Sequence, residues 1–167
     1  ADGNYSMIPG GYSNRTSGSY TFAAGRQAKA TNTGSFVWAD SIGSNFGSTG
    51  TNQFRVRAQG GVWFYSNGGA TTGVRLSTGS GSWASLSDAA SKENIVPVNG
   101  REVLAALNNM PMAKWNYKAQ SEEVVHMGPM AQDFHKAFGI GEDDKTICSI
   151  DADGVALAAI QGLNQLI

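Results

Sequence analysis

The first half of the chain alternates apolar and polar residues in short runs separated by glycine, a pattern that predicts β-strands. The run GSYTFAAG recurs as GSFVWADS sixteen residues later, an offset that pairs Tyr20 with Phe36 and Phe22 with Trp38. Short repeats with glycine at the corners are typical of stacked β-coils, each of which needs neighbours to cover its apolar face. We therefore predict a repetitive β-helix or β-roll.

The alternation continues beyond the repeats. The segment NQFRVRAQGGVWFYSN places Phe54 and Val56 on one face of a strand and Arg55 and Arg57 on the other. A second strand follows the glycine pair, and GVRLSTGSGSWASL predicts a third strand with a glycine–serine connector. With Arg75, the two arginines form either the solvated face of the strands or a surface that binds an acidic glycan.

The second half of the chain predicts an α+β fold. REVLAALNNM has a helical period, with Asn99 as N-cap and Pro111 blocking continuation. AKWNYK and EEVVHM predict a hairpin, and PMAQDFHKAFG predicts a second helix that ends at Gly139. We expect KTICSI to form a further strand and DADG a turn.

The last segment, VALAAIQGLNQLI, predicts a helix with an apolar seam. Ala156, Ile160, Leu163 and Ile167 are spaced by four, three and four residues. This spacing fits a coiled coil or an ordinary amphipathic helix, and isoleucine in the seam is compatible with three strands. Because the pattern reaches the last residue, we expect the natural chain to continue as a longer coil.

Composition divides the chain into 1–81 and 82–167. The first part holds 16 of the 22 glycines and has a net charge of +4, whereas the second has −5. A change this sharp predicts a domain boundary. The glycine-rich part has few large aliphatic residues and would bury a thin core by itself, so we expect it to assemble with other chains.

Several classes of protein are excluded or disfavoured. The overall net charge of −1 argues against nucleic-acid binding, and no run of 18 apolar residues predicts a membrane span. The first residues lack the regions of a signal peptide. GSGSWAS lacks the third glycine of a dinucleotide-binding loop. The single cysteine, Cys148, cannot form an internal disulfide, and between isoleucines we expect it to be buried.

No metal site or cofactor is expected. Asp151 and Asp153 in DADG suggest calcium, but an EF-hand loop needs a glutamate at the position of Gly162. The isolated His126 and His135 have no second ligand at metal-binding spacing. We expect His126 to pack beside a strand and His135 to lie on an exposed helix face.

The stretch LSDAASKENI is either a capped helix or a nucleophile with its base. The Ser87 hydroxyl needs a base, and a lysine amine such as that of Lys92 serves only when neutral. An unperturbed lysine pKa is about 10.4, and desolvation lowers it. Asp88 beside the amine would favour the charged form, so we interpret Asp88 as a cap or backbone anchor. The nearest electrophile is the carbonyl of Leu86.

LSDAASKENI, W.Y, HMGPMAQDF and DADGVALAAIQGL, in this order, resemble the C-terminal intramolecular chaperone domain of endosialidase tailspikes and phage tail fibres. The same self-cleaving domain occurs in myelin regulatory factor-like transcription factors. The resemblance covers roughly 82–167. The glycine-rich half resembles the heads of trimeric autotransporter adhesins and the shafts of phage fibres.

The resemblance implies a homotrimer, located in the virion, whose C-terminal domains hold three chains in register while the β-fibre folds. It also implies that Ser87 and Lys92 form an autoproteolytic dyad that cuts at the Leu86/Ser87 junction. The alternative is a bacterial surface adhesin with a purely structural trimerisation module. A transcription-factor-like release module is disfavoured because the first half carries no nucleic-acid-binding motif.

Overall fold

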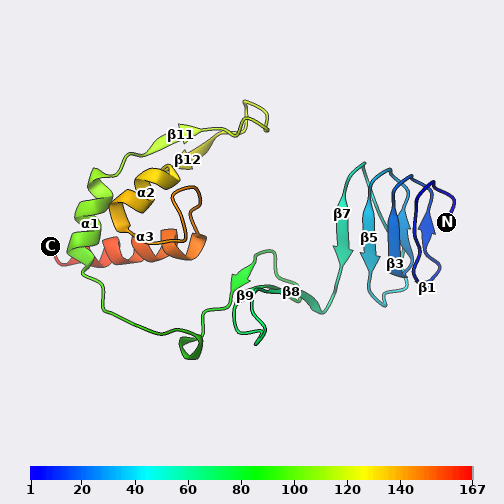
Figure 1. Cartoon of the computed structure of the whole chain (residues 1–167), viewed down its shortest axis with the longest axis horizontal. Coiled ribbons are helices and arrows are strands. Elements are labelled where there is room, and N and C mark those ends of the chain that lie inside the picture. The colour runs from blue at the N-terminus through cyan, green and yellow to red at the C-terminus, as the bar shows by residue number, and fades with distance from the viewer. Residues whose placement is uncertain (167) are drawn as a thin grey trace. The chain divides into compact units, whose positions relative to one another are not determined.

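The computed structural model describes residues 1–166 and divides into two compact units, Ala1–Ser91 and a second that begins at Lys92. The first unit contains the repetitive β-structure, and the second contains three α-helices and one hairpin (Figure 1). The predicted fold class, a β-rich N-terminal half and an α+β half ending in a helix, is confirmed. Within residues 1–166 no helix is long and apolar enough to cross a membrane.

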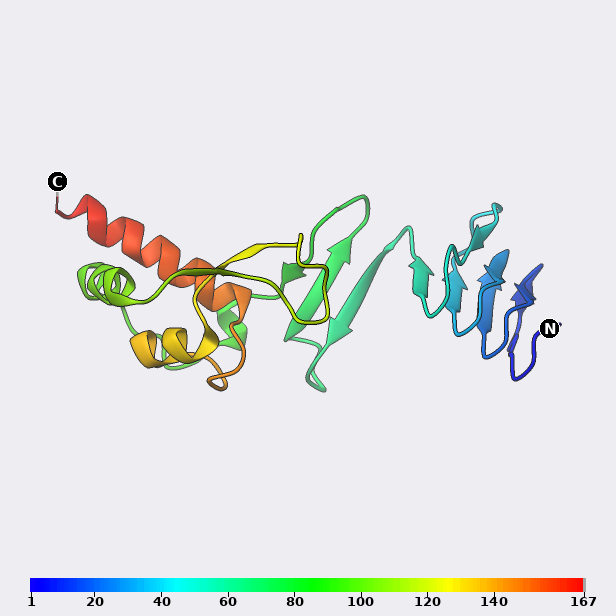
Figure 2. The same cartoon turned by 90° about the horizontal axis from the view of Figure 1, so that it is seen from above.

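The N-terminal strands stack as a β-solenoid of about three turns (Figure 2). They form two parallel sheets, one on each side of the coil. The first sheet contains, in order, β1 (Gly11–Tyr12), β3 (Phe22–Arg26), β5 (Phe36–Ala39) and β7 (Phe54–Arg57). The second contains β2 (Arg15–Thr16), β4 (Ala28–Ala30) and β6 (Phe46–Gly47).

The interior of the solenoid is built from small side chains. Its fully buried apolar residues are Ala23, Ala28, Ala30, Val37 and Ala39. Burial of one methylene-sized group contributes only about 0.8 kcal/mol, so four alanines and a valine stabilise the coil weakly. The thin core is the reason why each coil depends on its neighbours.

The register of the coils differs from the predicted one. Phe22 pairs with Phe36 rather than with Trp38, so the offset is fourteen residues and not sixteen. Tyr20 instead stacks on Tyr5, with ring centroids 5.2 Å apart. A shift of two residues leaves every side chain on the same face, so alternation alone does not distinguish the two registers.

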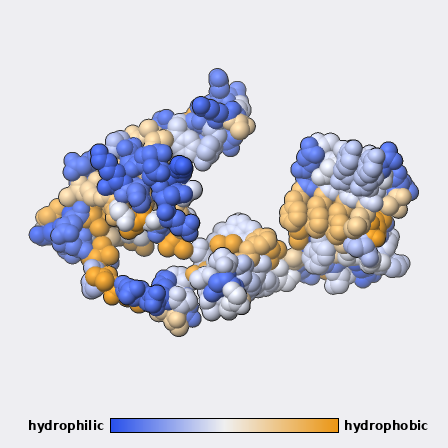
Figure 3. All heavy atoms as spheres, in the orientation of Figure 1, coloured by the Kyte–Doolittle hydropathy of each residue, from blue (hydrophilic) through white to orange (hydrophobic). Residues whose placement is uncertain are grey.

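One column of phenylalanines fixes the observed register. The rings of Phe22, Phe36 and Phe54, here called the aromatic column, stack with centroid separations of 4.5 and 4.7 Å. The column lies on the outer face of the first sheet, because the neighbouring Ala23 and Val37 point inward. Phe54 is 69% exposed. Figure 3 shows hydrophobic residues gathered in a band across the solenoid.

The sequence suggested that Arg55 and Arg57 lie on a solvated strand face or bind a glycan. In the structure the two arginines cover the end of the core. They pair with the buried Val37 and Ala39 of the preceding coil and are themselves partly buried. Their guanidinium groups lie 4.9 and 5.3 Å from the ring centre of Phe46. Since β7 ends the solenoid, the two arginines close its interior with their stems and cation–π contacts.

Asp40 holds Arg57 in this position by a salt bridge of 2.8 Å, and from this pairing we expect the first unit to lose stability in acid. The carboxylate accepts hydrogen bonds from Gln59 N at 2.8 Å and Arg57 Nε at 2.8 Å. These bonds, that of Gln59 first, keep the pKa of Asp40 below its usual value. Because the folded-state pKa is the lower one, the stabilisation is present above about pH 4 and is lost as the pH falls through the folded value.

Replacement of Asp40 by asparagine is therefore expected to lower the melting temperature of the first unit at neutral pH. It should also flatten the fall in melting temperature on acidification. Thermal unfolding followed by circular dichroism between about pH 3 and 7 measures both effects. Parallel pH profiles for the wild type and D40N would show that Asp40 does not cause the acid sensitivity.

A three-stranded antiparallel sheet follows the solenoid. Its order is β10 (Ala84–Ser85), β9 (Gly73–Ser77) and β8 (Gly61–Tyr65). The predicted strands are therefore confirmed, and the glycine–serine connector contributes a short third one. Phe64 and Trp83 approach to 5.7 Å between ring centroids. Arg75 is exposed on β9, unlike the two engaged arginines.

The second unit packs three helices around a small core. The helices are α1 (Gly100–Asn109), α2 (Ala131–Phe138) and α3 (Ser149–Asn164), and the hairpin is β11 (Ala113–Trp115) with β12 (His126–Gly128). Met110, Phe134 and Val155 form the buried centre. Asn99 caps α1 by accepting a hydrogen bond from Arg101 N at 3.1 Å, as predicted.

Two predictions for the chain before α3 are wrong. KTICSI forms no strand in the described residues, and DADG is not a turn but lies inside α3. The acidic Asp151 in the first turn of α3 favours a helix start there, since it complements the helix dipole. Cys148 is the N-cap residue of α3 and is exposed, so the prediction that it is buried is also wrong.

Helices α1 and α3 approach each other at two glycines. A Cβ atom added to Gly162 would lie 2.1 Å from the carbonyl oxygen of Gly100, and one added to Gly100 would lie 2.7 Å from Ala158 O. Neither position accepts a larger residue without moving backbone. The start of α1 is thereby fixed against the end of α3.

Candidate active site

The segment before Ser87 is held at the edge of the three-stranded sheet. Ser85 pairs with Val74, and Leu86 N then donates to Gly73 O at 2.9 Å. This bond lies one residue beyond the last residue of β10. The peptide bond between Leu86 and Ser87 therefore lies where the chain leaves the β-structure.

Asp88 organises the turn that follows. Its Oδ1 accepts a hydrogen bond from Ala90 N at 2.9 Å, and its carbonyl oxygen accepts one from Ser91 Oγ at 2.8 Å. These bonds close a 3₁₀ turn over Ala89–Ser91. The Asp88 carboxylate thus bonds the backbone of the turn, in the manner of a cap.

Ser87 and Lys92 lie on the two sides of this turn. Ser87 belongs to the first unit, and Lys92 is the first residue of the second unit. Both side chains are exposed in the single chain. The candidate nucleophile thus lies four residues before the end of the β-unit at Ser91, and the candidate base opens the helical unit.

A pocket of about 350 Å³ lies beside the Leu86/Ser87 peptide bond. One wall is the segment itself, from Leu86 through Ser87 and Asp88 to Ser91. The other wall is Ala70 and Thr71, from the turn between β8 and β9. The sequence analysis did not find these two residues, because no local pattern reveals which loop lies opposite a given strand end.

The residues of the predicted seam lie on the exposed side of α3. Ala156, Ile160 and Leu163 are exposed, whereas Val155 and Ala159 on the other side are buried against the unit. The helix therefore carries apolar residues on both sides. The fourth seam residue, Ile167, lies outside the described residues.

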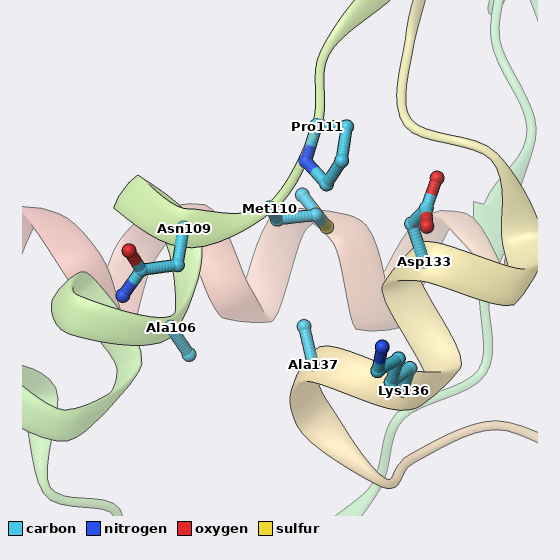
Figure 4. A pocket seen from close by; sticks show the side chains of 7 residues that line it. All are labelled: Ala106, Asn109, Met110, Pro111, Asp133, Lys136 and Ala137. Carbon is cyan, nitrogen blue, oxygen red and sulfur yellow. The ribbon is translucent and has the colours of Figure 1, made fainter.

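A second pocket, of about 360 Å³, lies between α1 and α2 (Figure 4). Its polar groups come from Asn109 on α1 and from Asp133 and Lys136 on α2. It contains no serine, cysteine or histidine that could act as a nucleophile. Within residues 1–166 there is also no cluster of three or more ligating side chains that could hold a metal ion.

The comparison with protein families matches a segment that begins at a residue of the first pocket. Residues 87–139 match the model of the family Peptidase_S74, described as chaperone of endosialidase. The matched region begins at Ser87, and the family's name places it among the peptidases. The resemblance found in the sequence is thus confirmed for this segment. No curated protein and no solved structure matched the chain.

Proposed function

Because residues 87–139 match the model of the chaperone of endosialidase, we propose that the chain is the C-terminal part of a trimeric phage tail fibre or tailspike. Its chaperone domain gathers three chains, sets the register of the β-fibre and then releases itself by autoproteolysis. One observation carries this proposal. The family match begins at Ser87, and the β-ladder ends at Leu86, so a cut between them separates fibre from chaperone.

The proposed chemistry uses one serine and one lysine. Neutral Lys92 accepts the proton of the Ser87 hydroxyl, and Oγ attacks the carbonyl carbon of Leu86. The carbon–nitrogen bond breaks, and the Ser87 nitrogen leaves with the proton from Lys92. Water then hydrolyses the resulting ester, which leaves a carboxylate on Leu86 and returns the hydroxyl of Ser87.

Assembly is proposed to start the reaction. Desolvation favours the neutral form of a lysine amine, and Lys92 is exposed in the single chain. Burial of Lys92 between neighbouring chains would therefore supply the base only once the trimer has formed. The cut follows folding for this reason and does not precede it.

Two exposed apolar surfaces support the trimer. The aromatic column leaves Phe54 69% exposed, and the seam on α3 leaves Ile160 and Leu163 64% and 52% exposed. Large apolar side chains on the outside of both units are typical of surfaces that bind another chain. A threefold assembly would cover the column in the fibre and the seam in the chaperone.

The test is a denaturing gel of the full chain with Ser87→Ala as its partner. We expect the wild type to yield pieces of 86 and 81 residues and S87A to remain one band. Light scattering of intact S87A should give the mass of three chains. A wild-type trimer that remains uncut would refute self-cleavage and favour a structural trimerisation module, and a monomeric S87A would refute the trimer.

A further inference from the structure

The turn between β8 and β9 faces the bond that is proposed to be cut. Ala70 and Thr71 share the pocket of about 350 Å³ with Leu86 and Ser87. The turn belongs to the same antiparallel sheet that holds Leu86 (Figure 2). All of these residues lie in the first unit, so the fibre contributes one wall of the site.

Asn67 fixes this turn with three hydrogen bonds. Its Oδ1 accepts from Thr71 N at 3.0 Å and from Thr72 N at 3.2 Å, and its Nδ2 donates to Thr71 Oγ1 at 2.8 Å. The Thr71 hydroxyl is therefore the acceptor in its bond with Asn67. A hydroxyl that accepts still has its own hydrogen to donate. Thr71 thus brings a hydrogen-bond donor to the pocket.

Gly73 holds Leu86 beside this turn. Leu86 N donates to Gly73 O at 2.9 Å, and Gly73 follows Thr71 by two residues. The register of Ser85 with Val74 places Leu86 opposite Gly73 and agrees with this bond. Since β10 ends at Ser85, the Leu86 carbonyl group lies just beyond the ladder, on the side of the pocket that Thr71 lines.

We propose that the Thr71 hydroxyl is the donor of the oxyanion hole of the self-cleavage reaction. This inference rests on the proposed function. When Ser87 Oγ bonds to the Leu86 carbonyl carbon, the electron pair of the C=O double bond moves to the oxygen. A hydroxyl donor that the fold already holds in this pocket stabilises the charge in the transition state. The charge disappears when the carbon–nitrogen bond breaks.

The oxyanion hole makes folding of the last fibre hairpin a condition for the cut. Thr71 belongs to the β8–β9 hairpin, and it shares a pocket with Leu86 only when β10 has paired with β9. A chain whose chaperone has assembled but whose hairpin is unfolded would have nucleophile and base without stabilisation of the oxyanion. The reaction thereby depends on the state of the fibre as well as on that of the chaperone.

The test compares single-turnover cleavage rates of full-length variants on denaturing gels. We expect Thr71→Val to cut about 100-fold more slowly than the wild type and Thr71→Ser to cut within a few-fold of it. Thr72→Val is the matched control and should cut at the wild-type rate, since Thr72 bonds Ser66 and does not line the pocket. Asn67→Asp should be as slow as T71V. The carboxylate keeps the bonds from the backbone but takes the Thr71 hydrogen for itself.

The outcomes separate this inference from the proposed function. Wild-type rates for both T71V and N67D, with S87A inert, would overturn the oxyanion hole and leave self-cleavage intact. Equal slowing of T71V, T71S and T72V would also overturn it, because such a pattern reports on the fold of the turn. A wild type that is not cut at all would refute the proposed function, and the oxyanion hole with it.

Discussion

Replacement of Lys92 by arginine is expected to slow self-cleavage by about 1,000-fold and to leave the trimer intact, since a general base typically contributes between 10² and 10⁴ to the rate. Arginine keeps the positive charge and the length of the side chain, so contacts that depend on charge survive. It does not lose its proton in a protein, however, and cannot accept that of Ser87. The measurement is the half-time of cleavage after refolding, read from a gel.

The matched control for this variant is Lys118→Arg. Lys118 is also exposed and lies in the second unit, in the loop between β11 and β12, so its replacement should not change the half-time. Cleavage of K92R at the wild-type rate would exclude Lys92 as the base.

Replacement of Gly162 by valine is expected to destabilise the second unit by about 3 kcal/mol, at the upper end of what overpacking usually costs. The new Cβ would lie 2.1 Å from the carbonyl oxygen of Gly100, a backbone atom that no side-chain rotation can remove. The ends of α1 and α3 would have to separate, and the capped start of α1 would move with them. Urea unfolding of the uncut S87A background, followed by circular dichroism, gives the difference in the free energy of unfolding.

Gly154→Val provides the control for this experiment within the same helix. No atom lies within 4 Å of a Cβ added to Gly154, so the same substitution is expected to change the free energy of unfolding by no more than about 0.5 kcal/mol. Equal losses for G154V and G162V would mean that the contact with Gly100 does not cause the effect, since valine is no worse a helix former than glycine. The close approach of α1 and α3 would then not be needed for stability.

The part of the candidate site that comes from one short segment of the chain was predictable from the sequence. The order of Ser87, Asp88 and Lys92 is visible in ten residues, and the family comparison begins at the same serine. The opposite wall was not predictable. Thr71 reaches the pocket through the pairing of β9 with β10, and the register of a sheet is a property of two segments and not of one.

The same limit explains the errors in the fold. Alternation predicted strands in the right places, but it does not distinguish registers that differ by two residues. The observed register, in which Phe22 stacks on Phe36, has an offset of fourteen residues. Arg57 was expected on an exposed strand face, either solvated or binding an acidic glycan, because arginine is mostly exposed. Only the end of the solenoid, with Asp40 and Phe46 nearby, makes a partly buried arginine favourable.

The start of α3 illustrates how tertiary packing overrides local propensity. DADG has the composition of a turn, and Gly154 disfavours a helix. The helix nevertheless runs from Ser149 to Asn164, because Val155 and Ala159 pack into the core and Asp151 favours the first turn. By contrast, α1 had a clear cap at Asn99 and a stop at Pro111, and it was predicted within one residue at each end.

The hydrogen bond from Leu86 N to Gly73 O has a consequence for the released fibre. After the cut, Leu86 would be the C-terminal residue of the shaft, and chain ends usually fray. Here the backbone N–H of the terminal residue would keep its hydrogen bond to Gly73 of β9, with the free carboxylate directly beyond it. The finished shaft would end in a paired strand and not in a frayed tail. Extracellular proteases would therefore find little unpaired chain to cleave at this end.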